Sequence, residues 1–201
     1  MCGIEKSVIF AATLWEVGGV VKSPKFGYKR VCEFPFEVWE NDTKRLVITR
    51  IGLASSSLAF AWAAQRYAFD EAINIGSVGA ADSSLGRDDI GRYFDITKVS
   101  CIEPYCETYF ELPVLGGTET ATLATTSRPV STLEERAHAA NFGRVADMEG
   151  WALAQAAQAY SKKLYMRKIL SDFSPECDIH PSNLAVCTAL GKLENFCVWE
   201  Q

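Results

Sequence analysis

The sequence has few of the residues from which metal and disulfide sites are built. It contains two histidines and seven cysteines, and no two cysteines have Cys-x-x-Cys spacing. Zinc sites need closely spaced cysteine and histidine ligands, so we expect no metal, and we expect no other cofactor. The odd number of cysteines favours reduced thiols and a cytoplasmic location over a disulfide framework.

Long apolar runs, basic stripes and low-complexity linkers are also lacking. No apolar run reaches the length of a membrane span, and 25 acidic residues outnumber 20 basic ones. We therefore expect neither a membrane nor a nucleic acid as partner. The 201 residues are 48% hydrophobic and 22% charged, which suits one domain, residues 1–201, with a hydrophobic core.

What is present is an alternation of short strands and helices. Apolar or β-branched runs bounded by Gly, Asp or Ser predict strands at Val8–Ala12, Arg45–Thr49, Glu71–Ile75, Tyr93–Val99 and Met166–Leu170. Helical patterns cover Ser55–Tyr67, Leu133–Ala140, Glu149–Lys163 and Leu184–Phe196. The first apolar run is interpreted as a core strand and not as a signal peptide. This alternation predicts an α/β fold with a mostly parallel sheet.

Acidic residues stand just after predicted strands and at a helix start. Glu16 follows the first strand, Asp172 follows the last, and Asp147 and Glu149 flank the start of the third helix. The segment 74–80 adds two glycines and a serine after another strand. Ligands of parallel sheets bind beyond the carboxyl ends of the strands, where these residues should meet.

Each of these features also has a plain structural explanation. Acids stabilise the N-terminal end of a helix, an aspartate often begins a turn, and two glycines fit an ordinary turn. An acid after a strand can also simply be exposed. Their joint placement at one edge favours a pocket that binds a polyol and moves a proton.

Three segments together resemble the signature segments of the nucleoside phosphorylase and nucleosidase superfamily: Asn74–Gly79, Val145–Gly150 and Ile169–Asp172. The likeness is greatest to the 5′-methylthioadenosine/S-adenosylhomocysteine nucleosidases and runs from Val8 to about Phe196. It implies a single-domain, three-layer α/β/α phosphorylase-like fold with a mixed, mostly parallel central sheet. It also implies a small-molecule purine nucleoside as substrate and a homodimer or larger homo-oligomer.

The resemblance also implies roles for single residues. Asp172 would protonate the departing purine at N7, Glu16 would activate the attacking water, and Glu149 would hold the ribose hydroxyls. Such a reaction passes through an oxocarbenium-like state, which protonation of the leaving base makes accessible. The remaining substrate-binding residues would be Met148, Asp147, Ser77, Gly79, Ala12, Ser171, Val130 and Phe173.

The choice between hydrolysis and phosphorolysis depends on whether cationic side chains are present to bind phosphate. The phosphorylases of this superfamily have an arginine where this chain has the neutral Asn74, which favours hydrolysis. Arg50 and Arg87 are possible substitutes. The alternatives are a futalosine hydrolase, a purine nucleoside phosphorylase, and a nucleoside-binding or storage protein without activity.

The chain departs from the nucleosidase pattern in three places. Lys168 replaces an arginine, and Trp151 is bulkier than the residue expected there. Segment 125–130 lacks the aromatic residue that would stack on the base, a role open to Arg128 or Phe173. These changes bear on which nucleoside is bound more than on the reaction.

Overall fold

The computed structural model describes residues 7–104, 106 and 108–172. Within that part of the chain ten strands form one sheet, in which the order β10-β6-β8-β9-β5-β1-β4-β3-β2 is joined by β7 beside β6 and by a further β10–β5 pairing. The strands are β1 (Ser7–Ala11), β2 (Lys29–Cys32), β3 (Glu37–Glu40), β4 (Lys44–Ile48), β5 (Glu71–Ala80), β6 (Tyr93–Cys101), β7 (Tyr109–Glu111), β8 (Glu119–Thr125), β9 (Val145–Asp147) and β10 (Lys163–Asp172).

The centre of the sheet is parallel. β4, β1, β5 and β10 are neighbours in this order and run the same way, with antiparallel pairs β3–β4, β10–β6 and β5–β9 around them. The helices are α1 (Leu14–Val21), α2 (Leu53–Arg66), α3 (Leu133–Ala140) and α4 (Gly150–Ala159), with short 3₁₀ turns at Pro24–Phe26 and Arg87–Asp89. Because α1 and α2 follow β1 and β4 directly, their N-termini lie at the carboxyl edge of the parallel strands.

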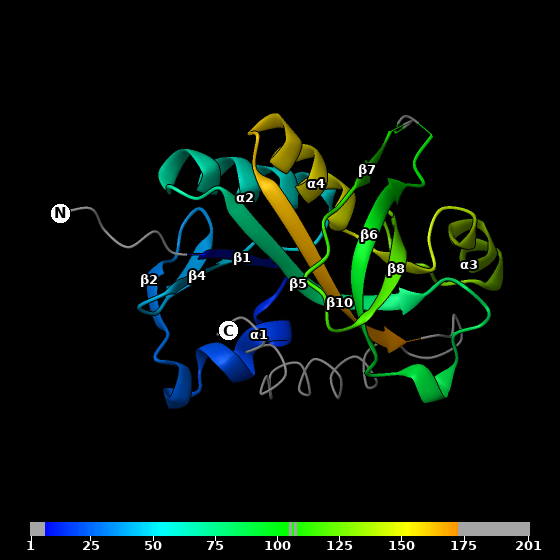
Figure 1. Ribbon diagram of the computed structural model, residues 1–201, viewed down its shortest axis with the longest axis horizontal. Coiled ribbons are helices and arrows are strands. Elements are labelled where there is room, and N and C mark those ends of the chain that lie inside the picture. Colours follow the sequence, from blue (N-terminus) through cyan, green and yellow to red (C-terminus); the bar gives the residue numbers. More distant parts are fainter. Residues whose placement is uncertain (1–6, 105, 107, 173–201) are drawn as a thin grey trace.

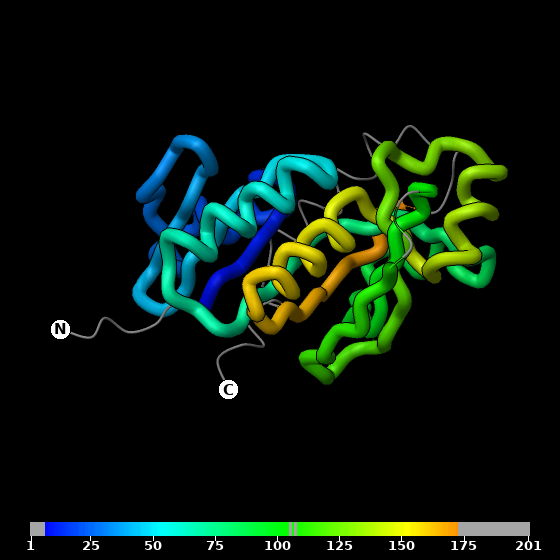
Figure 2. The backbone as a smooth tube through the Cα atoms, turned by 90° about the horizontal axis from the view of Figure 1, so that it is seen from above, coloured from blue at the N-terminus to red at the C-terminus, as the bar shows by residue number. Residues whose placement is uncertain are grey.

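Helices cover both faces of the sheet, as the three-layer prediction requires. Side chains alternate along a strand, so Val8 and Phe10 of β1 face one way and Ile9 and Ala11 the other. The first pair packs under α2 and α4, where the rings of Phe10 and Phe60 stack 4.9 Å apart. The second pair packs under α1 (Figure 1). Figure 2 shows α2 and α4 side by side on their face.

The predicted elements are confirmed in kind, but several bounds were wrong. All five predicted strands are present, and β5 and β10 are longer than predicted. Helix α4 ends at Ala159 and not at Lys163, because Ser161 takes a left-handed conformation (φ 53°) and β10 begins at Lys163. Helix α1 and strands β2, β3, β7, β8 and β9 were not predicted. The predicted helix at residues 184–196 lies outside the described residues.

The aromatic segment at residues 34–39 divides between core and surface. Phe36 and Val38 are buried, whereas Phe34 is 82% exposed. Phe36 packs against Trp62 of α2 with ring centroids 5.7 Å apart. No helix in the described ranges is long and apolar enough to cross a membrane.

Candidate functional site

Glu16 is buried at the start of α1 and points at β5. It is the third residue of the helix and closes a capping box, in which Thr13 N donates to Glu16 Oε2 at 3.0 Å and Glu16 N donates back to Thr13 Oγ1 at 3.4 Å. Its other oxygen, Oε1, accepts hydrogen bonds from Ser77 N at 2.9 Å and Ser77 Oγ at 3.0 Å. The local sequence thus fixes the carboxylate, and the fold brings it to the predicted Ser77.

Asp172 lies at the end of β10 and faces the end of β5. It pairs in register with Gly79, where an added Cβ would lie 2.8 Å from Asp172 Oδ1, so only glycine leaves room for the carboxyl group. Ser171 Oγ lies 2.8 Å from Asp172 Oδ2 and 3.0 Å from Val78 O, and its one hydrogen can be donated to either oxygen. Burial raises the pKa of Asp172, against the opposing effects of the Ser171 hydroxyl and the Arg136 charge. A carboxyl group in this state can act as an acid.

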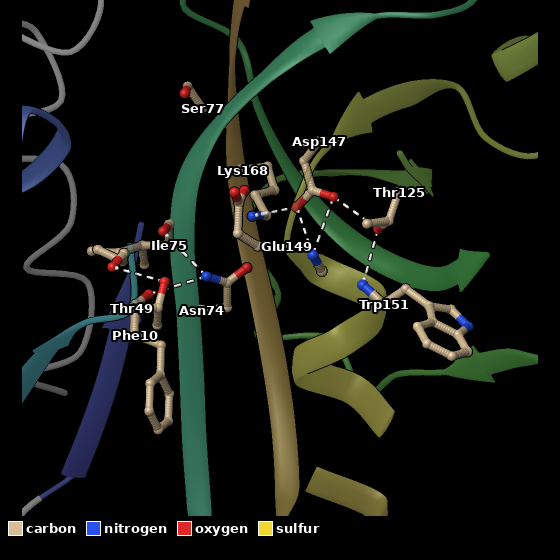
Figure 3. A network of polar contacts seen from close by, with 12 residues as sticks. Phe10, Thr49, Asn74, Ile75, Ser77, Thr125, Asp147, Glu149, Trp151 and Lys168 are labelled. Atoms are coloured by element: carbon tan, nitrogen blue, oxygen red, sulfur yellow. Dashed lines mark hydrogen bonds and ion pairs between the residues drawn. The ribbon is translucent and has the colours of Figure 1, made fainter. Parts of the chain in front are cut away.

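Asp147 holds the start of α4. Its carboxylate accepts from Gly150 N at 3.0 and 3.1 Å and from Thr125 Oγ1 at 2.8 Å, while Thr125 Oγ1 accepts from Trp151 N at 2.9 Å. Lys168 Nζ lies 2.9 Å from Asp147 Oδ2, and both side chains are almost fully buried (Figure 3). The helix-start explanation therefore applies to Asp147.

Glu149 does not serve the helix in this way. It occupies the N-cap position of α4, yet its side chain makes no capping hydrogen bond and accepts instead from Gly52 N at 2.9 Å. The loop presents this N–H through left-handed backbone at Arg50 (φ 66°) and Gly52 (φ 100°). Burial and then the neighbouring Asp147 raise the pKa of Glu149 to about 7, although Lys168 and Gly52 pull it down.

The other predicted substrate-binding residues do not all lie near the acids. Ala12 is buried after β1, and Met148 is half-buried between the two acids. Val130 packs beside α3 and lines a cavity of about 460 Å³ together with Thr126, Arg128 and His138. None of the three predicted carboxylates Glu16, Glu149 and Asp172 lines this cavity. Phe173 lies outside the described residues.

The structure also places the residues that depart from the nucleosidase pattern. Trp151 turns toward β7, where its Nε1 donates to Thr108 O at 2.9 Å and its ring lies 5.8 Å from that of Phe110. Arg128 is largely exposed and forms an ion pair with Glu135 at 2.6 Å. The bulk of Trp151 is therefore accommodated away from the acids.

Sequence reasoning missed three partners that the fold supplies. Thr125 links Asp147 to α4, Gly52 binds Glu149, and Arg136 of α3 acts on Asp172. Asn74 is buried and donates to Phe10 O at 3.1 Å, while its Oδ1 has no hydrogen-bond partner among the described residues. No group of three or more potential metal ligands occurs in the described ranges.

Comparison with solved structures relates this geometry to known proteins. The 5′-methylthioadenosine/S-adenosylhomocysteine nucleosidase of Neisseria meningitidis, in complex with methylthio-immucillin-A, matches with a TM-score of 0.77 and 17% identity, over 94% of this chain and 95% of that one. The chain has the nucleosidase fold. A futalosine hydrolase mutant of Helicobacter pylori matches with a TM-score of 0.74 and 12% identity, over 94% of this chain and 99% of that one.

A second 5′-methylthioadenosine/S-adenosylhomocysteine nucleosidase, that of Colwellia psychrerythraea in complex with adenine, matches at 20% identity and a TM-score of 0.71, over 94% of this chain and 96% of that one. These are folds of the superfamily that the three sequence segments resemble, so the predicted fold is confirmed. No protein-family model and no curated protein matches the sequence.

Proposed function

We propose that this chain is a purine nucleosidase that hydrolyses the N-ribosyl bond of a nucleoside such as 5′-methylthioadenosine or S-adenosylhomocysteine. The observation that carries the proposal is Asp172, a half-buried carboxyl group with a raised pKa beside the end of β5. The same end of β5 binds Glu16 through Ser77 and pairs with β9, which Glu149 follows. Cleavage of an N-ribosyl bond needs an acid for the base, a base for water and an acceptor for the sugar.

Each residue has a definite task in this mechanism. Protonated Asp172 gives its proton to the purine at N7, so the base leaves as a neutral molecule. Ionised Glu149 accepts hydrogen bonds from the ribose hydroxyls, with Met148 as the apolar surface under the sugar. Glu16, oriented by Thr13 and Ser77, takes a proton from the water that attacks the anomeric carbon.

The contacts of the nearby cationic side chains favour hydrolysis over phosphorolysis. Arg50 Nη2 donates to Pro35 O at 3.1 Å, and its guanidinium lies 6.0 Å from the ring centroid of Phe36. Arg87 is exposed on its 3₁₀ turn. Lys168 is bound to Asp147, and Asn74 carries no charge. A phosphate dianion needs charged donors; Arg50 and Lys168 are already engaged, and Asn74 supplies no charge.

The nature of the 5′ substituent is a further choice. A futalosine hydrolase is the second candidate, because the Helicobacter pylori enzyme matches over 99% of its length. The cytoplasmic location and the homodimer are also part of the proposal. Unpaired cysteines at positions 32, 101 and 106 and the exposed apolar side chains Phe34, Ile51 and Leu58 support these two points.

One assay tests the reaction. Wild-type protein and Asp172→Asn are incubated with a panel of purine nucleosides and futalosine, with and without phosphate, and free base and sugar are measured. We expect free ribose or its 5′-substituted form from wild type, no need for phosphate, and a rate lower by about 10²–10⁴-fold in Asp172→Asn. Asp70→Asn, at an exposed ion pair with Lys162, is the matched control.

Three results would contradict the proposal. Full turnover by Asp172→Asn would refute the acid role. Ribose 1-phosphate as product, with turnover that depends on phosphate, would identify a phosphorylase. Tight binding of a nucleoside without any release of base would identify a nucleoside-binding protein.

A further inference from the structure

Lys168 is a buried cation that the mechanism above does not use. It lies in the middle of β10, opposite Gly76 of β5, and is 2% exposed. Its ammonium group is 2.9 Å from Asp147 Oδ2. A methyl group added at Gly76 would lie 3.5 Å from Lys168 Nζ and 3.1 Å from Glu16 Oε1, so the charges of these two residues converge above the same glycine.

Three carboxylates surround this ammonium group. Asp147 contacts it directly, and Glu149 lies beside the pair (Figure 3). Glu149 and Glu16 both act on it electrostatically. Burial lowers the pKa of Lys168, but the three acids outweigh this and hold the pKa above its ordinary value. Lys168 is therefore charged at neutral pH, and one positive charge stands against three acidic groups.

Hydrogen bonds and ion pairs stabilise the negative charges of Glu16, Asp147 and Glu149 to different extents. Glu16 accepts hydrogen bonds from Thr13 and Ser77, and Asp147 accepts from Thr125 and Gly150 in addition to its ion pair. Glu149 accepts one hydrogen bond from the described residues, that of Gly52 N. Lys168 forms its ion pair with Asp147, and among the described residues Glu149 has no cation in direct contact.

We propose that Lys168 is a positioning residue that controls the charge of Glu149 and thereby its grip on the ribose hydroxyls. This inference rests on the proposed function for its effect on catalysis. The groups that face Glu149 are Glu16 from α1, Gly52 N at the start of α2, Asp147 from β9 and Lys168 from β10.

The pKa of Glu149, raised to about 7 by burial and by Asp147, agrees with this arrangement. Ionised Glu149 is the form that accepts hydrogen bonds from a diol, so the fall of kcat/KM toward acid should report its pKa in the free protein. A stronger cation contact at position 168 should lower that pKa, and loss of the cation should raise it.

The test compares Lys168→Arg and Lys168→Met with Lys163→Arg and Lys163→Met, which change an exposed lysine of the same strand. The pKa of Glu149 is measured without substrate by carbon NMR of ¹³C-labelled glutamate carboxyl groups, with Glu149→Gln to assign the signal. We expect Lys168→Arg to lower it and Lys168→Met to raise it, each by about one unit. The acid limb of the kcat/KM profile should move by the same amount, and the Lys163 variants should leave both unchanged.

The outcomes separate this inference from the proposed function. A Glu149 signal whose pKa is the same in wild type and Lys168→Arg would overturn the inference, even if Lys168→Met failed to fold. A shifted NMR pKa in a protein that releases no base from any nucleoside would refute the nucleosidase and keep the control of Glu149 by Lys168. Shifts of equal size in the Lys163 variants would show a general charge effect and would also overturn the inference.

Discussion

Arg167 and Lys168 are consecutive buried cations on β10, and they differ in how their charges are balanced. Arg167 faces one acid, Asp95 of β6, with Nε to Oδ1 at 2.7 Å and Nη2 to Oδ2 at 3.1 Å. The backbone of Gly116 satisfies both groups further, since its N–H donates to Asp95 and its carbonyl oxygen accepts from Arg167, each at 2.7 Å. Lys168 faces three acids on the other side of the strand.

The difference separates a structural ion pair from a site that can change charge. The Arg167–Asp95 pair is closed, because each group has its counter-charge and further hydrogen bonds. Among the described residues, the cluster around Lys168 has an excess of acid, and protonation of Glu149 relieves it. Unbalanced buried charge is unfavourable for stability, so its presence beside Glu16 indicates function.

The largest change in stability is expected at the Arg167–Asp95 pair, in which the two charges balance. Arg167→Met removes the partner of a buried carboxylate and should lower the free energy of unfolding by about 3–5 kcal/mol. Urea unfolding followed by circular dichroism measures this change. The matched control is Arg30→Met, which breaks surface pairs with Glu33 and Glu37 and should cost less than about 1 kcal/mol. Equal losses in the two variants would contradict the structural role of the Arg167 pair.

A smaller change with a different pH dependence is expected at the unbalanced cluster. Folded Glu149 keeps its proton up to about pH 7, whereas its ordinary pKa is 4.5. Between these values the folded state binds more protons than the unfolded state, so this residue's contribution to stability falls as pH rises through the window. Glu149→Gln should therefore be more stable than wild type above pH 7, by on the order of 2 kcal/mol, and the difference should vanish below about pH 4.5.

Urea titrations of wild type and Glu149→Gln at several pH values check this expectation. Asp172 also has a raised pKa, but it is present in both proteins, so the difference between them isolates Glu149. A Glu149→Gln protein that is less stable than wild type at alkaline pH would show that the carboxylate stabilises the fold. The proposed excess of acid would then be wrong.

The fold could be predicted from the sequence where apolar strands are buried on both faces. Strands β1 and β5 have nearly continuous buried apolar residues, and their pattern is unmistakable. Strands β7 and β9 have three residues each, and β2 is mostly exposed, so neither length nor periodicity marks them. These short strands exist because neighbouring strands offer them hydrogen bonds, which a local pattern does not reveal.

The sequence indicated which acids form the candidate site, but not which residues bind them. Glu16 and Asp172 could be grouped because they follow strands that are both parallel to β5, and the carboxyl ends of parallel strands meet at one edge. Glu149 follows β9, which runs antiparallel to β5, so its place beside them depends on the fold. The hydrogen bond from Gly52 to Glu149 joins residues 97 positions apart. The positive charge that lowers the pKa of Asp172 belongs to Arg136, on helix α3. The Thr13–Glu16 capping box was visible in the sequence, and it would have predicted α1 and the orientation of Glu16.

The smallest effect is expected at Thr125, whose hydroxyl group supports Asp147. Thr125→Val keeps the shape of the side chain and removes the hydroxyl that joins Asp147 to Trp151 N. Because the site is fully buried, an N–H at the start of α4 then lacks its acceptor, and the free energy of unfolding should fall by about 1–2 kcal/mol. Thr120→Val, on the exposed part of the same strand, should have little effect. The loss should be the same at acid and alkaline pH, because no titrating group is removed, in contrast to the Glu149 variant. A loss confined to alkaline pH would contradict this role. It would mean that Thr125 is coupled to the titration of the acidic cluster and does not only support Asp147 structurally.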